Sequence, residues 1–312
     1  MSNTQNTMLV VGGGIMGAGI ATSFASAGWT VHVMSPSQKT RDALPASIRT
    51  GLSKLQVDEA LADKVGIHES LDTVPWASLA LVVESVTEDL PLKQRLFPDL
   101  AARSTATTIL ATNTSSFPIG DIAKAVPEAD RPRVAGLHYF MPAHLVPLVE
   151  IVRSEFTADW VVDSLEGWMR AARKAPIRVN KDICGFIGNR LQAALIREAL
   201  YLVESGVTTA QGIDDAVRFG FGFRFLACGP MKQKEFSGWD TNLAAGNVIY
   251  PTLCNNAKHG EMLHGMIAAG QIGMKTKRGF WEYTDEKIAA EKAAYEKKLR
   301  QAFELLQSEL GG

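Results

Sequence analysis

A glycine-rich turn near the N-terminus constrains the fold of this chain more than any other feature. Residues 8–11 form a short apolar run, glycines follow at positions 12, 14 and 17, and a helical pattern then continues to Gly28. A strand, the spacing G-x-G-x-x-G and a helix together indicate a turn in which the backbone closely approaches a pyrophosphate at the helix N-terminus. The sequence therefore predicts a dinucleotide-binding βαβ unit. The cofactor contacts predicted in this turn are Gly12, Gly14, Ile15, Met16 and Gly17.

Composition narrows the classes of protein that remain. The chain has 312 residues, enough for two domains, and a formal net charge of −1, so no overall field attracts nucleic acid or an anionic membrane. No apolar run reaches the roughly 20 residues that span a bilayer, and residues 1–7 lack the features of a secretory signal. The cysteines at 184, 228 and 254 lie far apart without metal-ligand spacing. We therefore expect a cytoplasmic protein with no metal site.

The character of the chain changes near residue 183. Before it, strand-like apolar runs alternate with helical patterns, which predicts a doubly wound α/β domain with a parallel sheet. After it, apolar residues follow helical spacing to the C-terminus. We expect a Rossmann domain at residues 1–182 and an all-helical domain at residues 183–312. The strand-like runs are residues 8–11, 30–34, 79–83, 108–111, 134–137, 148–152 and 177–179.

Five further motifs follow the glycine turn in a fixed order. They are NTSS at 113–116, HYFMP at 138–142, LVEI at 148–151, GFIGNR at 185–190 and GMKTKRGFWEY at 273–283. Together these motifs closely resemble the 3-hydroxyacyl-CoA dehydrogenase superfamily over essentially the whole chain. The resemblance implies an NAD(P)-binding Rossmann domain followed by a helical domain that holds substrate and forms a homodimer. It also assigns cofactor contacts to Glu88 and Asn113.

The same resemblance places the catalytic histidine at His138 and its partner carboxylate at Glu150. Their separation of 12 residues suits a strand, a turn and a returning strand. An imidazole is suited to removing a hydroxyl proton as hydride leaves the carbon, and a carboxylate on its other nitrogen fixes the tautomer. The resemblance further implies that Ser115 and Asn189 contact the reacting oxygen, where alkoxide character develops.

Each of these residues also has a structural interpretation. His138 could be a hydrogen-bonded histidine at a strand end, Ser115 could serve only its turn, and Asn189 could cap a helix beginning at Arg190. Glu150 lies in an apolar strand, where an unpaired carboxylate is costly to bury. It therefore requires a partner, and His138 is the obvious one.

The residue that ends the second predicted strand differs from the usual pattern of NAD-binding proteins. An acidic residue normally ends the second strand and binds the ribose hydroxyls, but Ser35 occupies this place. Ser37, Lys39 and Arg41 follow it and could bind a 2′-phosphate. The sequence therefore favours NADP slightly over NAD. The alternative is that Ser35 contacts the ribose of NAD and the basic residues form a solvated helix start.

The substrate region departs from the acyl-CoA enzymes. In those enzymes a long helical excursion after the second strand helps to hold CoA, whereas here residues 41–71 are short and contain few basic residues beyond Arg41. Met141 also replaces an asparagine that many members carry. This version resembles the branch that acts on small free hydroxy acids, such as the carnitine and gulonate dehydrogenases.

Arg224 is the candidate partner for a substrate carboxylate, because a guanidinium binds a carboxylate in a two-pronged fashion. Alternatively, Arg224 stacks on Phe223 or Phe225, or pairs with Glu235.

We expect an NAD(P)-dependent dehydrogenase acting on a 3-hydroxyl group of a small hydroxy acid or related alcohol. A 3-hydroxyacyl-CoA dehydrogenase acting on a thioester is the alternative. A non-catalytic nucleotide sensor or structural protein is a second one.

Overall fold

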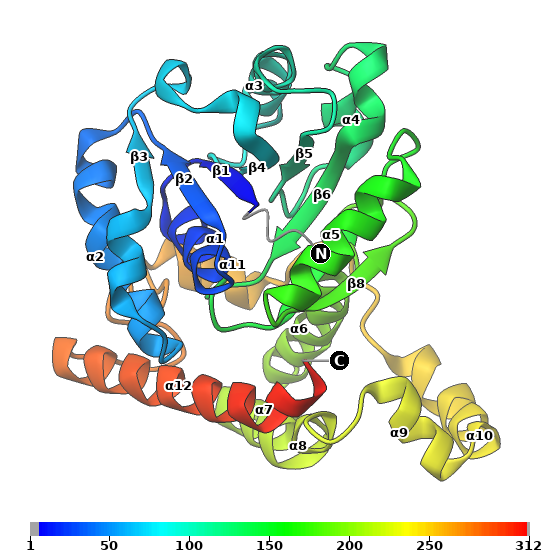
Figure 1. The fold of residues 1–312 in the computed structure, drawn as a ribbon. Coiled ribbons are helices and arrows are strands. Elements are labelled where there is room, and N and C mark those ends of the chain that lie inside the picture. Colours follow the sequence, from blue (N-terminus) through cyan, green and yellow to red (C-terminus); the bar gives the residue numbers. More distant parts are fainter. Residues whose placement is uncertain (1–5, 311–312) are drawn as a thin grey trace. The chain divides into compact units, whose positions relative to one another are not determined.

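A computed structural model describes residues 6–310, and their contacts divide the chain into two compact units (Figure 1). One unit comprises the chain through Asn189 together with the segment from Leu299 onward, and the other spans Arg190–Lys298. The domain boundary expected between residues 182 and 183 stays a prediction. Within the described residues, no helix is long and apolar enough to cross a membrane.

An eight-stranded sheet forms the centre of the first unit, with strand order β3-β2-β1-β4-β5-β6-β7-β8. All neighbouring strands are parallel except β6 and β7, which are antiparallel. This sheet confirms the α/β fold predicted from the alternating runs. The strands are β1 (Thr7–Val11), β2 (Thr30–Met34), β3 (Gly66–His68), β4 (Leu79–Glu84), β5 (Ile109–Thr112), β6 (Val134–Tyr139), β7 (Leu148–Val152) and β8 (Ala175–Val179).

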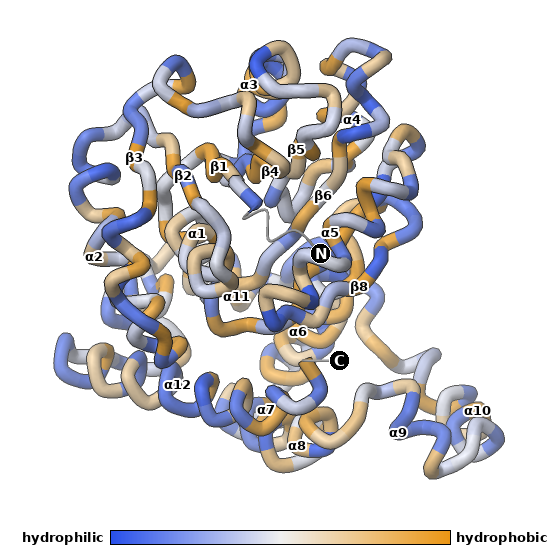
Figure 2. Tube along the Cα trace, in the orientation of Figure 1, coloured by the Kyte–Doolittle hydropathy of each residue, from blue (hydrophilic) through white to orange (hydrophobic). Residues whose placement is uncertain are grey.

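Strand β3 is the one strand of this sheet that the sequence analysis did not find. It has only three residues, all half-buried, so it lacks the continuous apolar run that marks the central strands. Figure 2 shows hydrophobic residues concentrated along those central strands, as expected when both faces of a parallel sheet are covered.

Helices cover both faces of the sheet and create two apolar cores. Residues of α1, α2 and α5 pack into one core, and residues of α3 and α4 pack into the other. The helices of this unit are α1 (Ile15–Ser26), α2 (Gln38–Lys54), α3 (Leu90–Arg103), α4 (Ile119–Ala123) and α5 (Asp159–Ala171), with 3-10 turns η1 (Glu59–Lys64), η2 (Leu71–Thr73), η3 (Trp76–Ser78) and η4 (Glu128–Arg133).

The second unit is helical, as its apolar spacing predicts. Helix α6 (Gly188–Glu204) leads into it and α12 (Asp285–Leu306) leads out of it into the first unit. Within Arg190–Lys298 only Ala199 and Gly246 are buried. The other helices are α7 (Ala210–Ala216), the π-helical η5 (Val217–Phe221), α8 (Gly222–Phe225), α9 (Pro230–Ser237), α10 (Trp239–Ile249), the 3-10 turn η6 (Tyr250–Thr252) and α11 (Glu261–Ala268), and the 3-10 turn η7 (Gln307–Glu309) follows α12.

Candidate active site

The glycine turn joins the carboxyl end of β1 to the N-terminus of α1. Gly12 has φ +108°, a conformation that side chains strongly disfavour, and its N–H donates to the Met34 carbonyl at 2.9 Å. A β-carbon at Gly17 would lie 1.8 Å from the Gly12 carbonyl oxygen, so the helix can approach the turn only if residue 17 is glycine. At Gly14, by contrast, an added β-carbon would meet open space.

This turn fits a dinucleotide pyrophosphate. The N–H groups in the first turn of α1 have no intrahelical acceptor, and they lie at the positive end of the helix dipole. That first turn, which the structure describes throughout, carries no acidic side chain that would compete with a phosphate. Ile15 is 80% exposed and Met16 is half-buried beside the open space at Gly14.

His138 and Glu150 lie directly opposite each other on the antiparallel strands β6 and β7. The His138 Nδ1 and Glu150 Oε2 atoms are 2.6 Å apart. The other carboxylate oxygen, Oε1, accepts the backbone N–H groups of Ile187 at 2.9 Å and Gly188 at 2.8 Å. Glu150 is fully buried, so each carboxylate oxygen has a hydrogen-bond donor where water is excluded.

These contacts determine the charge of Glu150. Burial raises its pKa, but the hydrogen bonds from the His138 ring and from the Gly188 and Ile187 N–H groups outweigh burial, and the net pKa lies below the ordinary value. The carboxylate is therefore ionised at neutral pH. A carboxylate can only accept, so the neutral His138 ring carries its proton on Nδ1 and has a free lone pair on Nε2.

Aromatic rings fix the orientation of the His138 ring. The ring centroid of Phe140 lies 4.6 Å away, and that of Phe186 lies 5.5 Å away at a steep interplanar angle. The His138 side chain is 5% exposed. Its position is therefore restricted by packing as well as by Glu150.

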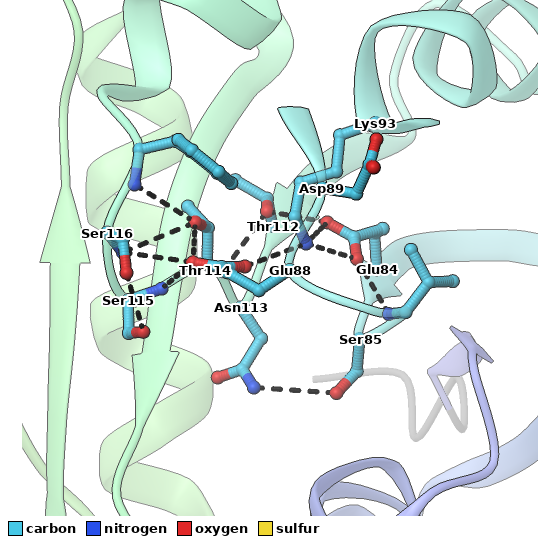
Figure 3. A network of polar contacts seen from close by, with 12 residues as sticks. Glu84, Ser85, Glu88, Asp89, Lys93, Thr112, Asn113, Thr114, Ser115 and Ser116 are labelled. Carbon is cyan, nitrogen blue, oxygen red and sulfur yellow. Dashed lines mark hydrogen bonds and ion pairs between the residues drawn. The ribbon is translucent and has the colours of Figure 1, made fainter. Parts of the chain in front are cut away.

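A buried ion pair lies at the carboxyl end of β4 (Figure 3). The ammonium of Lys93 lies 2.7 and 2.9 Å from the two carboxylate oxygens of Glu84, and both side chains are almost completely buried. Glu84 also accepts the Thr112 hydroxyl at 2.6 Å and the Val86 N–H at 2.7 Å. These bonds join the ends of β4 and β5 through side chains.

Glu88 extends this network to the loop after β5. Its Oε1 accepts the Thr114 hydroxyl at 2.6 Å and the N–H groups of Ser115 and Ser116 at 3.0 Å each, while its Oε2 lies 3.3 Å from Lys93. Burial raises the pKa of Glu88. The Thr114 hydroxyl, the charge of Lys93 and the Ser115 N–H together lower it by more, so the net pKa is below the ordinary value. In the structure, Glu88 therefore fixes the loop that carries Ser115.

Asn113 links this loop to the strand of His138. Its Oδ1 accepts the Tyr139 N–H at 2.9 Å. Its Nδ2 donates to the Ser85 hydroxyl at 3.4 Å (Figure 3). The structure thus places the predicted residues Glu88, Asn113 and Ser115 in one network beside β6.

Ser35, Ser37 and Arg41 come together at the carboxyl end of β2. Arg41 Nη1 donates to the Ser35 carbonyl at 2.8 Å, and the Ser37 hydroxyl accepts the Thr40 N–H at 3.3 Å as the N-cap of α2. Ser35 is buried, with 4% exposure. Of the groups that the sequence analysis assigned to a 2′-phosphate, Ser37 and Arg41 thus already have partners within the chain.

Asn189 and Arg224 occupy different units. Helix α6 begins at Gly188, so Asn189 lies within its first turn, directly after a Glu150 contact, and the proposal that it is an N-cap is wrong. Arg224 lies in α8 of the second unit and is exposed. Glu235, its suggested ion-pair partner, accepts the indole N–H of Trp239.

Sequence analysis missed three charged residues that support the site. The sequence indicates the pair of Glu84 and Lys93 only weakly: a glutamate that ends a buried apolar run requires a cation nearby. Nothing in the sequence around Lys174 indicates its role. Its ammonium donates to the carbonyls of Ala143 at 2.6 Å, His144 at 3.1 Å and Val146 at 3.0 Å, in the loop between β6 and β7, and burial lowers its pKa to about 7.

Residues 6–310 contain no group of three or more histidine, cysteine, aspartate or glutamate side chains arranged to hold a metal ion.

Comparison with known proteins defines the class. The family model for the NAD binding domain of 3-hydroxyacyl-CoA dehydrogenase matches residues 7–183, and the model for the C-terminal domain of that enzyme matches residues 185–283. The chain therefore belongs to the 3-hydroxyacyl-CoA dehydrogenase family. It is an NAD-dependent oxidoreductase of that family.

Similar proteins within the family differ in the substrates that their names state. The 5-formyl-3-hydroxy-2-methylpyridine 4-carboxylate 5-dehydrogenase of Mesorhizobium japonicum is 29% identical over 301 residues, covering 93% of this chain and 94% of that protein. A crystal structure of an enzyme of this name, described as an NAD⁺ dependent dismutase, has a TM-score of 0.88 at 27% identity and covers 97% of this chain and 98% of that one. Human mitochondrial hydroxyacyl-coenzyme A dehydrogenase is 32% identical over 288 residues, covering 88% of this chain and 90% of that protein.

Proposed function

We propose that this chain reversibly oxidises the secondary alcohol of a small carboxylic acid, with His138 as the general base. The contact between His138 Nδ1 and Glu150 Oε2 at 2.6 Å carries the proposal. It leaves Nε2 as the acceptor for a hydroxyl proton and places a buried negative charge behind the ring.

Bound NAD supplies the hydride acceptor. His138 Nε2 takes the hydroxyl proton as the carbon–hydrogen bond breaks, and Glu150 stabilises the imidazolium that forms. The Ser115 hydroxyl and the Asn189 amide donate hydrogen bonds to the reacting oxygen. Glu88 positions Ser115 through the backbone N–H of that residue, and Glu150 positions the start of α6, which carries Asn189.

Two observations support a small acid as the substrate. The pyridine carboxylate enzyme matches 93% of this chain, against 88% for the human CoA enzyme. Arg224 also offers an exposed guanidinium in an aromatic segment, and a carboxylate is the group that such a side chain binds best.

A CoA thioester is the second candidate, because relatives named for CoA substrates reach 33% identity. A nucleotide sensor without catalytic activity has less support, because binding a nucleotide does not require an ionised carboxylate behind His138.

The second unit is proposed to form a homodimer interface. Large apolar side chains are exposed along α9 and α10, where Phe236 is 76% exposed, Leu243 is 65% exposed and Val248 is 73% exposed. Several large apolar side chains exposed on two successive helices favour a protein interface there. A second copy of the chain is the proposed partner.

Replacing His138 with Gln should lower kcat by about 10²–10⁴-fold, the usual cost of losing a general base, and leave the Kd for NAD within about twofold. Glu150→Gln should also slow turnover, and the double variant should be far from additive, because the two residues act as a unit. Steady-state kinetics and isothermal titration calorimetry measure both quantities, with His259→Gln as control. Loss of NAD affinity equal to the loss of rate would assign His138 a structural role.

Replacing Arg224 with Met keeps an unbranched stem but removes the charge. If Arg224 binds the substrate carboxylate and the pair becomes buried in the complex, the change should cost about 2–5 kcal/mol in kcat/KM on the best free acid while NAD affinity is retained. Arg218→Met in the same unit is the control. Unchanged kinetics in a folded Arg224 variant would contradict the small-acid proposal and favour a thioester.

Light scattering coupled to size-exclusion chromatography should give a mass twice the chain mass of 33.8 kDa. Leu243→Asp places a charge on the exposed face of α10 and should shift the population toward monomer, whereas Trp160→Gln in the first unit should not. A monomer for the wild-type protein at micromolar concentration would rule out the homodimer.

A further inference from the structure

A serine, an arginine and a glutamate gather at the carboxyl ends of β2 and β3. Ser35 follows β2, and Glu69 follows β3. The Ser35 N–H donates to the His68 carbonyl at 3.0 Å, which joins the two strand ends directly. Glu69 therefore lies beside the position where dinucleotide-binding folds recognise the adenosine ribose.

Arg41 is held over these strand ends. Its Nη1 donates to the Ser35 carbonyl at 2.8 Å, and its Nη2 donates to the Gln38 side chain. The same Nη2 lies 3.7 Å from Glu69 Oε2. The Arg41 side chain is 14% exposed, whereas that of Glu69 is 74% exposed, so the arginine is fixed and the carboxylate faces solvent.

The charge of this cluster bears directly on cofactor choice. Arg41 alone, next to a serine at the end of β2, would attract a 2′-phosphate. A carboxylate 3.7 Å from the guanidinium balances that charge. It also repels a phosphate, and its oxygens can accept hydrogen bonds from free ribose hydroxyls.

We propose that Glu69 determines cofactor specificity, supplying from the end of β3 the acidic group that Ser35 does not supply from the end of β2. The chain accordingly prefers NAD to NADP, which reverses the slight preference for NADP expected from Ser35, Ser37 and Arg41. This inference rests on the proposed dinucleotide-dependent function.

Calorimetric titration of the full chain with NAD⁺ and with NADP⁺ tests the proposal without relying on turnover. Wild-type protein should bind NAD⁺ more tightly. Glu69→Gln should tighten NADP⁺ binding by about fivefold or more, with NAD⁺ affinity changed by no more than about threefold. In the Glu69→Gln/Arg41→Met double variant the gain for NADP⁺ should be smaller, because the freed guanidinium causes part of it and the loss of repulsion by Glu69 causes the rest.

Asp72→Asn is the matched control. Asp72 is also an exposed carboxylate paired with an arginine, with 75% exposure and a distance of 2.7 Å to Arg103. It follows β3 by four residues and, by the proposal, has no part in specificity. The control should leave both affinities unchanged.

Three results would overturn the proposal: tighter binding of NADP⁺ by the wild type, an unchanged affinity ratio in Glu69→Gln, or an equal shift in Asp72→Asn. Failure of the wild-type protein to bind either dinucleotide would instead contradict the proposed function, so the two failures are distinguishable.

Discussion

The buried carboxylate of Glu150 is the group on which the rest of the site depends. It accepts hydrogen bonds from the His138 ring and from the N–H groups that begin α6. A buried carboxylate without donors would be strongly destabilising. The same contacts that stabilise it therefore fix the tautomer of the histidine and the position of the helix that carries Asn189.

This arrangement requires the change of direction in the sheet. The five strand pairs from β3 to β6 are parallel, and so is the pair β7–β8. Only β7 runs antiparallel to β6, and this direction places Glu150 directly opposite His138. The connecting loop is short, and the Lys174 ammonium holds three of its carbonyls. On the other side of β6, Asn113 accepts the Tyr139 N–H, which ties the histidine strand to the network around Glu88.

The sequence predicted the elements whose patterns are local. Continuous apolar runs located the central strands, and the 12-residue separation of His138 and Glu150 correctly predicted a strand and its return. Strand β3 was missed because its three residues carry no apolar run. The start of α6 was placed two residues late, since the N–H groups that Glu150 binds cannot be identified from sequence.

Pairing of charged side chains was the least predictable part. Lys93 looks like a solvated lysine of an amphipathic helix, yet it is buried against Glu84. Arg41 looks available to a phosphate, yet it contacts the Ser35 carbonyl and lies near Glu69. The packing of α3 against the end of β4 brings Lys93 to Glu84, and the pairing of β2 with β3 brings Glu69 close to Arg41. Composition and spacing specify neither contact.

The central claim is that Glu150 holds the His138 ring with its proton on Nδ1 and a free acceptor on Nε2. Long-range ¹H–¹⁵N correlation spectra of the histidine side chains test it directly, with His138→Gln used for assignment. The neutral His138 ring should show a protonated Nδ1 and an unprotonated Nε2. A neutral ring protonated on Nε2 would contradict it, because Nε2 would then have no lone pair with which to accept the substrate proton.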